Sequence, residues 1–210
     1  MSDEADRKRH FSMLRDFHLA DFFTLGNGAC GTATILFAMD YLREGTVGKV
    51  YAAFVFAVAA LVFDVLDGRI ARWRHAASPM GRELDSLADV ISFGVAPAAL
   101  AFALGFSGLW DALVLLYFVC CGISRLARYN ITAEKLSGAE GKVKYFEGTP
   151  IPTSILLTTM LLVLAHTGRV GASLPFGTVD LGPWALHPLV LLFALSGSLM
   201  ISKTIHIPKP

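Results

Sequence analysis

The sequence has 210 residues, of which 54% are hydrophobic and 17% charged, and its mean hydropathy is +0.57. One water-soluble domain of this length could not bury so much apolar surface, so the composition predicts a polytopic membrane protein. The 18 basic and 17 acidic residues nearly cancel and leave a formal net charge of +1. The chain therefore lacks the basic excess of a nucleic-acid-binding surface, and we expect a lipid bilayer and no nucleic acid around it.

The apolar stretches, taken in chain order, predict an all-α fold. The first 21 residues alternate basic and apolar side chains, which is typical of an amphipathic helix lying in the membrane interface. A helix needs roughly 20 mostly apolar residues to cross a bilayer. Six stretches qualify as spans: 22–42, 50–67, 85–106, 109–129, 151–167 and 187–202. We expect a single domain over 1–210, with an interfacial helix at 1–21 and a six-helix bundle at 22–202.

The basic residues predict the orientation of these spans. Most of them lie before the first stretch, after the second, after the fourth and in the tail. Cytoplasmic segments are enriched in Lys and Arg, so both termini are expected in the cytoplasm, at the inner membrane if the source is bacterial. The connection at about 168–186 carries Gly, Pro and Thr with little charge and is predicted to be an external loop.

Four aspartates at the ends of the second and third stretches form the most informative pattern. Asp64 and Asp67 are three residues apart and Asp85 and Asp89 are four apart, so each pair shares one face of a helix. A turn at 78–81 would let the two helices pair antiparallel and bring the four carboxylates together. Four anions in a partly dry pocket require protons or divalent cations, and Mg²⁺ and Mn²⁺ prefer carboxylate oxygen. This predicts a metal site that opens to the cytoplasm.

Small and basic residues accompany the aspartates. Gly68, Ala71 and Gly81 leave room for a flat base or a diphosphate to approach the helices, and Arg72 can clamp a phosphate. Close helix packing is the ordinary alternative for the small residues, and a positive-inside anchor is the alternative for the arginine.

The whole segment matches D-x2-D-G-x2-A-R-x8-G-x3-D-x3-D, and in this the chain resembles the CDP-alcohol phosphatidyltransferase family. The resemblance implies a pair of divalent ions, Mg²⁺ or Mn²⁺, held by Asp64, Asp67, Asp85 and Asp89. It also implies that Asp89 is the catalytic base that activates the acceptor hydroxyl. The short element Thr24-x-x-Asn27 resembles another nucleotide-contacting part of the family. The positions implied to contact the CDP moiety are Asn27, Asp64, Gly68, Ala71, Arg72, Ser78 and Gly81.

A second block, Arg125-Leu-Ala-Arg128-Tyr129-Asn130 followed by Phe146-x-Gly-x-Pro-x-Pro152, is similar to the serine-using branch of that family. The resemblance implies CDP-diacylglycerol and L-serine as substrates and phosphatidylserine and CMP as products. It implies serine contacts from Arg125, Arg128, Tyr129 and Asn130. The two arginines share one helix face and could receive a carboxylate and a phosphate, with the positive-inside rule as the alternative explanation.

Other interpretations stay open at this point. The same chemistry could use inositol, inositol phosphate or glycerol phosphate as the acceptor. A membrane prenyltransferase also binds a lipid diphosphate through Mg²⁺ and Asp-rich helices, although Asp67-Gly68 and Arg72 fit it poorly. A divalent-cation transporter would line a path with carboxylates, but no ionisable residue continues such a path through the other spans. The apolar span surfaces also predict a homodimer.

Overall fold

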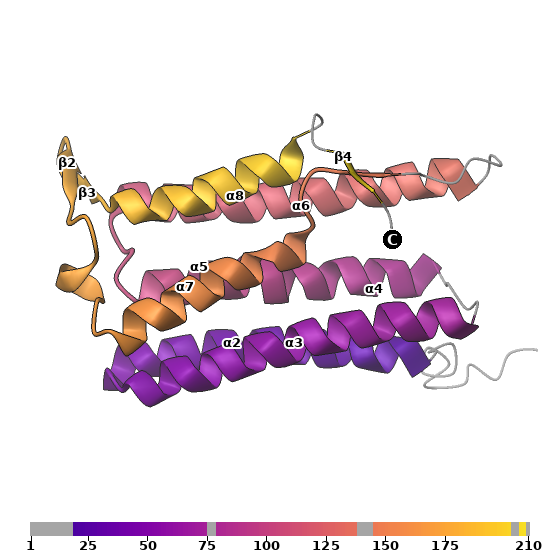
Figure 1. Cartoon of the computed structure of the whole chain (residues 1–210), viewed down its shortest axis with the longest axis horizontal. Coiled ribbons are helices and arrows are strands. Elements are labelled where there is room, and N and C mark those ends of the chain that lie inside the picture. Colours follow the sequence, from indigo (N-terminus) through magenta and orange to yellow (C-terminus); the bar gives the residue numbers. More distant parts are fainter. Residues whose placement is uncertain (1–18, 75–78, 138–144, 203–205, 209–210) are drawn as a thin grey trace, which may run out of the picture.

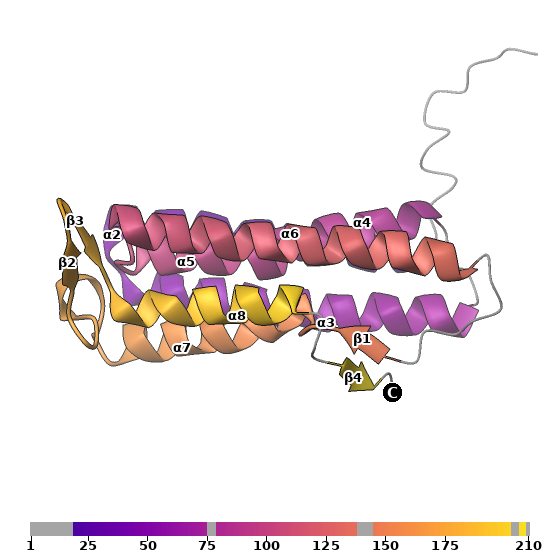
Figure 2. The same cartoon turned by 90° about the horizontal axis from the view of Figure 1, so that it is seen from above.

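A computed structural model of the chain describes residues 19–74, 79–137, 145–202 and 206–208. Its helices run along one long axis, as Figures 1 and 2 show from two directions. They are α2 (Leu19–Glu44), α3 (Val47–Arg74), α4 (Pro79–Asp89), α5 (Ala96–Ala103), α6 (Leu109–Ser137), α7 (Ile155–His166) and α8 (Leu191–Ile201). The short helical turns are η1 (Val90–Val95), η2 (Ile151–Ser154), η3 (Gly171–Ser173) and η4 (Pro188–Val190), and the strands are β1 (Tyr145–Glu147), β2 (Val179–Leu181), β3 (Trp184–Leu186) and β4 (His206–Pro208).

Four helical segments are long and apolar enough to cross a membrane, which indicates an integral membrane protein. They are Ala20–Glu44, Val47–Ile70, Met80–Ala103 and Leu109–Thr132. The fifth and sixth predicted spans coincide with two shorter apolar helices, Ile151–His166 and Pro188–Ile201. The chain is thus mostly helical, and the count of six spans stays a prediction. Residues 1–18 of the predicted interfacial helix lie outside the described residues.

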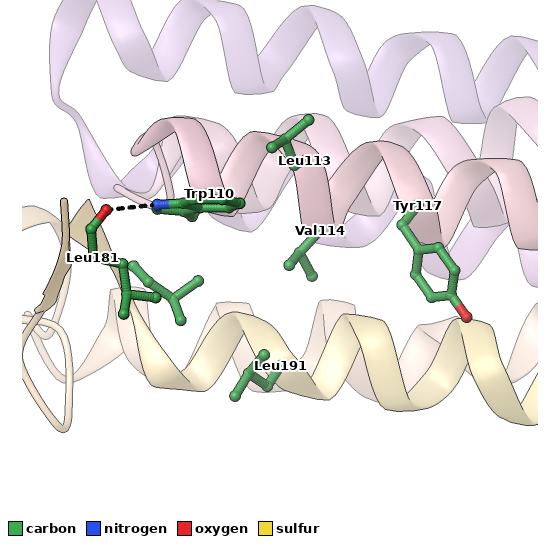
Figure 3. Close-up of a pocket in the computed structure, with 7 residues that line it drawn as sticks. Trp110, Leu113, Val114, Tyr117, Leu181 and Leu191 are labelled. Atoms are coloured by element: carbon green, nitrogen blue, oxygen red, sulfur yellow. Dashed lines mark hydrogen bonds between the residues drawn. The ribbon is translucent and has the colours of Figure 1, made fainter. Parts of the chain in front are cut away.

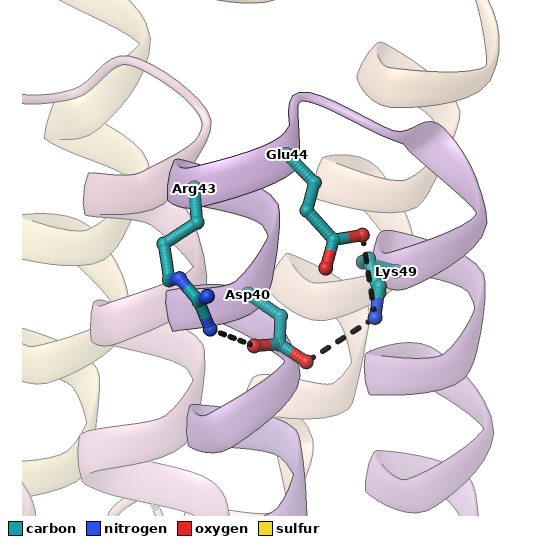
Figure 4. A network of polar contacts seen from close by, with 4 residues as sticks. All are labelled: Asp40, Arg43, Glu44 and Lys49. Atoms are coloured by element: carbon teal, nitrogen blue, oxygen red, sulfur yellow. Dashed lines mark hydrogen bonds and ion pairs between the residues drawn. The ribbon is translucent and has the colours of Figure 1, made fainter.

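Helices α2 and α3 form an antiparallel hairpin whose turn is tied by ion pairs (Figure 4). The Asp40 carboxylate accepts from Arg43 at 3.5 Å and from Lys49 at 3.2 Å, and Lys49 also lies 3.4 Å from Glu44. Gly45 supplies the positive φ of 65° that lets the chain reverse. Exposed pairs of this kind add little free energy, so the network orients the turn rather than stabilising the bundle.

The third span is one continuous rod, α4–η1–α5, with a π-helical segment in its middle. The backbone N–H of Ala96 donates to the Ile91 carbonyl five residues back, as a π-helix requires. Pro97 begins the next helix and has no N–H to donate to the preceding turn, which accounts for the irregularity there. The predicted stretch 85–106 did not include this break. It follows directly after Asp89.

Helix α8 packs closely along α6 (Figures 1 and 2). A side chain at Gly197 would meet the Phe118 Cα at 3.2 Å and the Cys121 Cβ at 3.3 Å, so the two backbones approach through a small residue. One turn earlier on α8, Phe193 meets the Phe118 ring edge-on, with centroids 5.3 Å apart. Small residues and interlocked rings thus set the spacing of this pair.

The predicted loop at 168–186 contains an antiparallel hairpin, β2–β3, at one end of the bundle (Figure 1). Asp111 in the first turn of α6 ties the end of that hairpin down: its carboxylate accepts from the backbone N–H of His187 at 2.8 Å and lies 2.6 Å from His187 Nδ1. It also accepts from the Gly108 N–H at 3.0 Å. A second ribbon pairs β1 with β4. These strands are short additions to the predicted all-α fold.

An open apolar groove of about 310 Å³ lies between the start of α6, the hairpin and α8 (Figure 3). The indole N–H of Trp110 donates to the Leu181 carbonyl at 3.0 Å and closes one end of it. Its other walls include Val114, Tyr117, Leu186 and Leu191. No charged group lines this groove, so it is unsuited to bind a diphosphate.

Candidate active site

The aspartates come together across the antiparallel pair of α3 and α4. Both helices run to the end of the bundle opposite the β2–β3 hairpin (Figures 1 and 2). One carboxylate oxygen each from Asp64, Asp67 and Asp85 lies within 4.8 Å of the others. We call these three residues the carboxylate cluster. Its geometry follows from the helical spacing of Asp64 and Asp67 and from the short connection between the helices.

The carboxylate cluster fits a divalent cation. Carboxylate oxygens bind Mg²⁺ or Ca²⁺ at about 2.0–2.6 Å, so two oxygens on one ion lie at most about 5 Å apart. The spacing within the cluster meets that limit. In addition, the buried Oδ1 of Asp85 has no hydrogen-bond partner among the described residues, as expected for an oxygen that serves a ligand.

Asp67 is held from the first span. The Thr24 hydroxyl of α2 donates to Asp67 Oδ2 at 2.8 Å, and both side chains are buried. One oxygen of Asp67 is thereby fixed by a neutral donor, which orients the other. The sequence pattern Thr24-x-x-Asn27 had suggested a nucleotide contact, whereas in the structure the threonine supports a member of the carboxylate cluster.

Asp89 has its own partner on the same face of α2. The Asn27 Nδ2 donates to Asp89 Oδ1 at 3.1 Å, and Asn27 is fully buried. The Oδ1 of Asn27 has no hydrogen-bond partner in the protein and stays available to a ligand. The guanidinium of Arg125 in α6 is close enough to Asp89 for their opposite charges to attract. Asp89 therefore sits between α2 and α6, beside the carboxylate cluster rather than within it.

Of the predicted nucleotide-side residues that the structure describes, Asn27 lies on α2, Gly81 lies at the start of α4, and the others lie on α3. A methyl group added at Gly68 would meet no protein atom within 4 Å, so the helix surface there is open and close helix packing does not explain the glycine. Gly81 is half-buried in the first turn of α4. The backbones of Ala71 and Arg72 belong to α3, but their side chains, and the whole of Ser78, lie outside the described residues.

The predicted acceptor residues all lie on α6, and they divide between two neighbours. Asn130 Nδ2 donates to the Ser86 hydroxyl of α4 at 3.0 Å and to the Glu83 carboxylate at 3.3 Å. Arg128 donates instead to the Ile201 carbonyl at the end of α8, at 3.4 Å. Tyr129 is 38% exposed. Arg125 and Asn130 therefore face the helix of the aspartates, whereas the observed hydrogen bond of Arg128 points toward α8.

Three polar contacts of the site were not predicted, although Thr24 itself belongs to the predicted Thr24-x-x-Asn27 element. Thr24 contacts Asp67, Ser86 contacts Asn130, and Ser92 of η1 donates to the Asn27 carbonyl at 2.9 Å. Ser86 lies between the two aspartates of α4, and its place inside the signature could have drawn attention to it. Ser92 follows Asp89 by three residues, but its partner is 65 positions away, so local spacing contains no signal for it.

Comparison with known proteins agrees with this geometry. A family model described as CDP-alcohol phosphatidyltransferase matches residues 17–196. The chain is 44% identical over 206 residues to the CDP-diacylglycerol–serine O-phosphatidyltransferase of Saccharomyces cerevisiae, a match that covers 97% of this chain and 75% of that protein. The Bacillus subtilis protein of the same name is 35% identical over 160 residues, covering 71% of this chain and 81% of the relative.

A third relative broadens the range of organisms. The archaetidylserine synthase of Methanothermobacter thermautotrophicus is 33% identical over 158 residues, which cover 74% of this chain and 62% of that protein. The family match includes α2 to α6, every element that contributes to the site, and most of α8. The chain belongs to the CDP-alcohol phosphatidyltransferase family.

Proposed function

We propose that the protein transfers the phosphatidyl group of CDP-diacylglycerol to L-serine and releases CMP. The observation that carries this proposal is the convergence of the carboxylate cluster with Asp89, on helices that match relatives named for this reaction over nearly the whole chain. The signature accounts for the phosphoryl transfer. The choice of serine is supported by the names of the relatives and by the basic and amide groups of α6.

Asp64, Asp67, Asp85 and Asp89 would together hold two divalent ions, Mg²⁺ or Mn²⁺. When bound, these ions would neutralise the diphosphate and stabilise the departing CMP. The protein contributes the fixed arrangement of the carboxylates. Thr24 holds one oxygen of Asp67, and the free oxygen of Asp85 faces no competing protein donor. The open surface at Gly68 would let the nucleotide approach α3. The family signature supports contacts from Ala71, Arg72, Ser78 and Gly81 as part of the proposal.

Asp89 is proposed to take the proton from the serine hydroxyl. Because Asn27 occupies its Oδ1, the second oxygen is directed to the acceptor. As the proton leaves, the serine oxygen forms a bond to the lipid-bearing β-phosphorus, and the bond from that phosphorus to the CMP oxygen breaks. The electron pair leaves with CMP. A direct displacement of this kind needs no protein nucleophile.

Serine is proposed to bind against α6. Arg125 is half-buried, and its Nε has no partner in the protein, so it can receive the serine carboxylate. Asn130 donates a hydrogen bond to Ser86 of α4 and would complete the pocket with Tyr129 and Arg128. Arg128 would have to share its guanidinium with the Ile201 carbonyl, which one of its nitrogens contacts.

The proposal includes the surroundings of the enzyme. Chain 1–210 would form one domain of six spans in a lipid bilayer, with an interfacial helix at 1–21, both termini in the cytoplasm and the active site open to that side. The distribution of basic residues supports this orientation. We further propose that the protein forms a homodimer through apolar span surfaces, which carry many exposed leucines and valines.

The test uses purified protein in lipid vesicles that contain CDP-diacylglycerol. With labelled serine and Mg²⁺ we expect labelled phosphatidylserine and CMP in equal amounts, and no product after chelation. Metal uptake into sealed vesicles is measured in parallel. Uptake without CMP release would replace the proposal by a cation transporter. In a separate reaction with an added prenyl diphosphate, release of diphosphate would indicate a prenyltransferase.

A further inference from the structure

Among the three glycines of helix α2, Gly31 lies closest to a neighbouring helix. A Cβ at this position would lie only 2.6 Å from the Ser92 Cα, a backbone atom that no side-chain rotation can move. Gly28, one turn away on the same helix, is different, because a Cβ there would meet the Ala88 Cβ at an ordinary 3.5 Å. The contact of Gly31 with Ser92 therefore sets the distance between α2 and the π-helical segment η1.

The same contact carries a hydrogen bond into the candidate site. The Ser92 hydroxyl donates to the Asn27 backbone carbonyl at 2.9 Å. Asn27 is four residues before Gly31, so the two lie on one face of α2. From that face, Asn27 Nδ2 donates to Asp89 Oδ1 at 3.1 Å, and Asp89 immediately precedes η1. Two hydrogen bonds thus join the same short pieces of α2 and of the third span.

All three polar groups are shielded from water. Asn27, Ser92 and Asp89 are 0%, 2% and 6% exposed. Water cannot replace either hydrogen bond if the helices separate, so the position of the Asn27 amide depends on the packing at Gly31. Hydrogen bonds weaken beyond about 3.2 Å, and the Asn27–Asp89 bond already measures 3.1 Å. A separation of a few tenths of an ångström would loosen it.

We infer that Gly31 and Ser92 are positioning residues for the reaction: they place Asn27 so that its amide holds the Asp89 carboxylate toward the acceptor. The inference rests on the proposed phosphatidyl transfer. The π-helical turn makes the arrangement possible by bringing the Ser92 backbone against a residue without a side chain. Within the carboxylate cluster, Asp67 has a hydrogen bond of its own from Thr24, which Ser92 does not share.

The experiment is a mutant cycle scored by CMP release, which serine and any other acceptor would produce alike. Gly31→Ala is expected to lower kcat by about 10- to 100-fold, because small displacements of catalytic groups have effects of this size. Ser92→Ala, which removes one hydroxyl and adds no bulk, should lower kcat by about 3- to 10-fold. The KM for CDP-diacylglycerol should change little in both. Gly28→Ala is the matched control and should behave as wild type.

Two further measurements separate positioning from general damage. In an Asn27→Ala background, Ser92→Ala and Gly31→Ala should have no additional effect on kcat, because the group through which they act is gone. Mn²⁺ affinity is measured by electron paramagnetic resonance without substrate in an Asp89→Asn background, where the carboxylate cluster alone carries the charge. Adding Ser92→Ala there should change the affinity by less than about threefold, because the serine contacts no member of the cluster.

The outcomes distinguish failure of the positioning role from failure of the proposed phosphatidyl transfer. Additive losses in the Asn27→Ala background, or a Mn²⁺ affinity that falls when Ser92→Ala is added to Asp89→Asn, would overturn the positioning role and leave the proposed function standing. A wild-type protein that releases no CMP would overturn the proposed function, and this inference with it.

Discussion

Asp67→Asn is expected to lower the rate of CMP release by about 100-fold or more at about 1 mM Mg²⁺. Removing one group that stabilises the charge of a transition state typically lowers kcat by about 10²–10³. The amide keeps the size of the side chain and can still accept from Thr24, but it removes one negative charge from the carboxylate cluster. Two like charges about 4 Å apart repel by about 4 kcal/mol at an effective dielectric constant of ~20, so the cluster is a strong attractor for a cation that offsets this repulsion. Losing one charge weakens that attraction.

The measurement is a titration of CMP release with Mg²⁺, together with Mn²⁺ binding in the absence of substrate. Asp67→Asn should bind Mn²⁺ more weakly and recover part of its activity at high metal concentration. Asp40→Asn is the matched control, since Asp40 pairs with exposed Arg43 and half-buried Lys49 at the α2–α3 turn, far from the carboxylate cluster, and should be dispensable. Near-normal turnover of Asp67→Asn at low Mg²⁺ would refute the metal assignment.

Asp89→Asn should lower kcat by about 10²–10⁴, the range in which general bases contribute. An amide cannot take the proton of the acceptor hydroxyl, so saturating metal should not restore activity. That behaviour separates Asp89 from Asp67, whose loss is expected to be relieved in part by metal. Asn27→Ala should have a smaller effect of the same kind, about 10-fold in kcat, because it leaves the base in place but frees its orientation.

The contrast is measured by comparing kcat at increasing Mg²⁺ for Asp67→Asn, Asp89→Asn and wild type in the same lipid. If Asp89→Asn recovered wild-type kcat at high metal concentration, Asp89 would act as a metal ligand alone. The proton would then have to pass to another group or directly to solvent.

The site could be predicted from the sequence where its geometry is local. Asp64 and Asp67 share a helix face through a spacing of three, and Asp85 of α4 lies beside them. The bounds of the predicted turn at 78–81 were wrong, because α4 already begins at Pro79, and residue 78 lies outside the described residues. Helix boundaries were predicted less well. The apolar run ends near residue 67, but α3 continues to Arg74, because hydropathy identifies only the apolar part of a helix.

The parts that depend on distant contacts could not be predicted. The partner of Asp89 lies 62 positions away, and the Thr24–Asp67 bond spans 43 positions. Periodicity within one helix carries no information on which face of α2 meets α3 or α4. The π-helical turn did have a local signal, Pro97 soon after Gly94, but a proline in an apolar stretch is equally compatible with a simple kink.

The most direct test of the central claim is a competition among acceptors. Purified wild-type protein in vesicles with CDP-diacylglycerol and Mg²⁺ receives L-serine, inositol, inositol phosphate and glycerol phosphate, each alone and in equimolar mixture, and the lipid products are separated. The account predicts phosphatidylserine as the dominant product of the mixture and the highest kcat/KM for L-serine. D-serine is a control that tests whether the arrangement of the carboxylate and ammonium groups is recognised. A higher kcat/KM for any of the other three acceptors would contradict the assignment of serine and would leave the roles of the carboxylate cluster and of Asp89 in place.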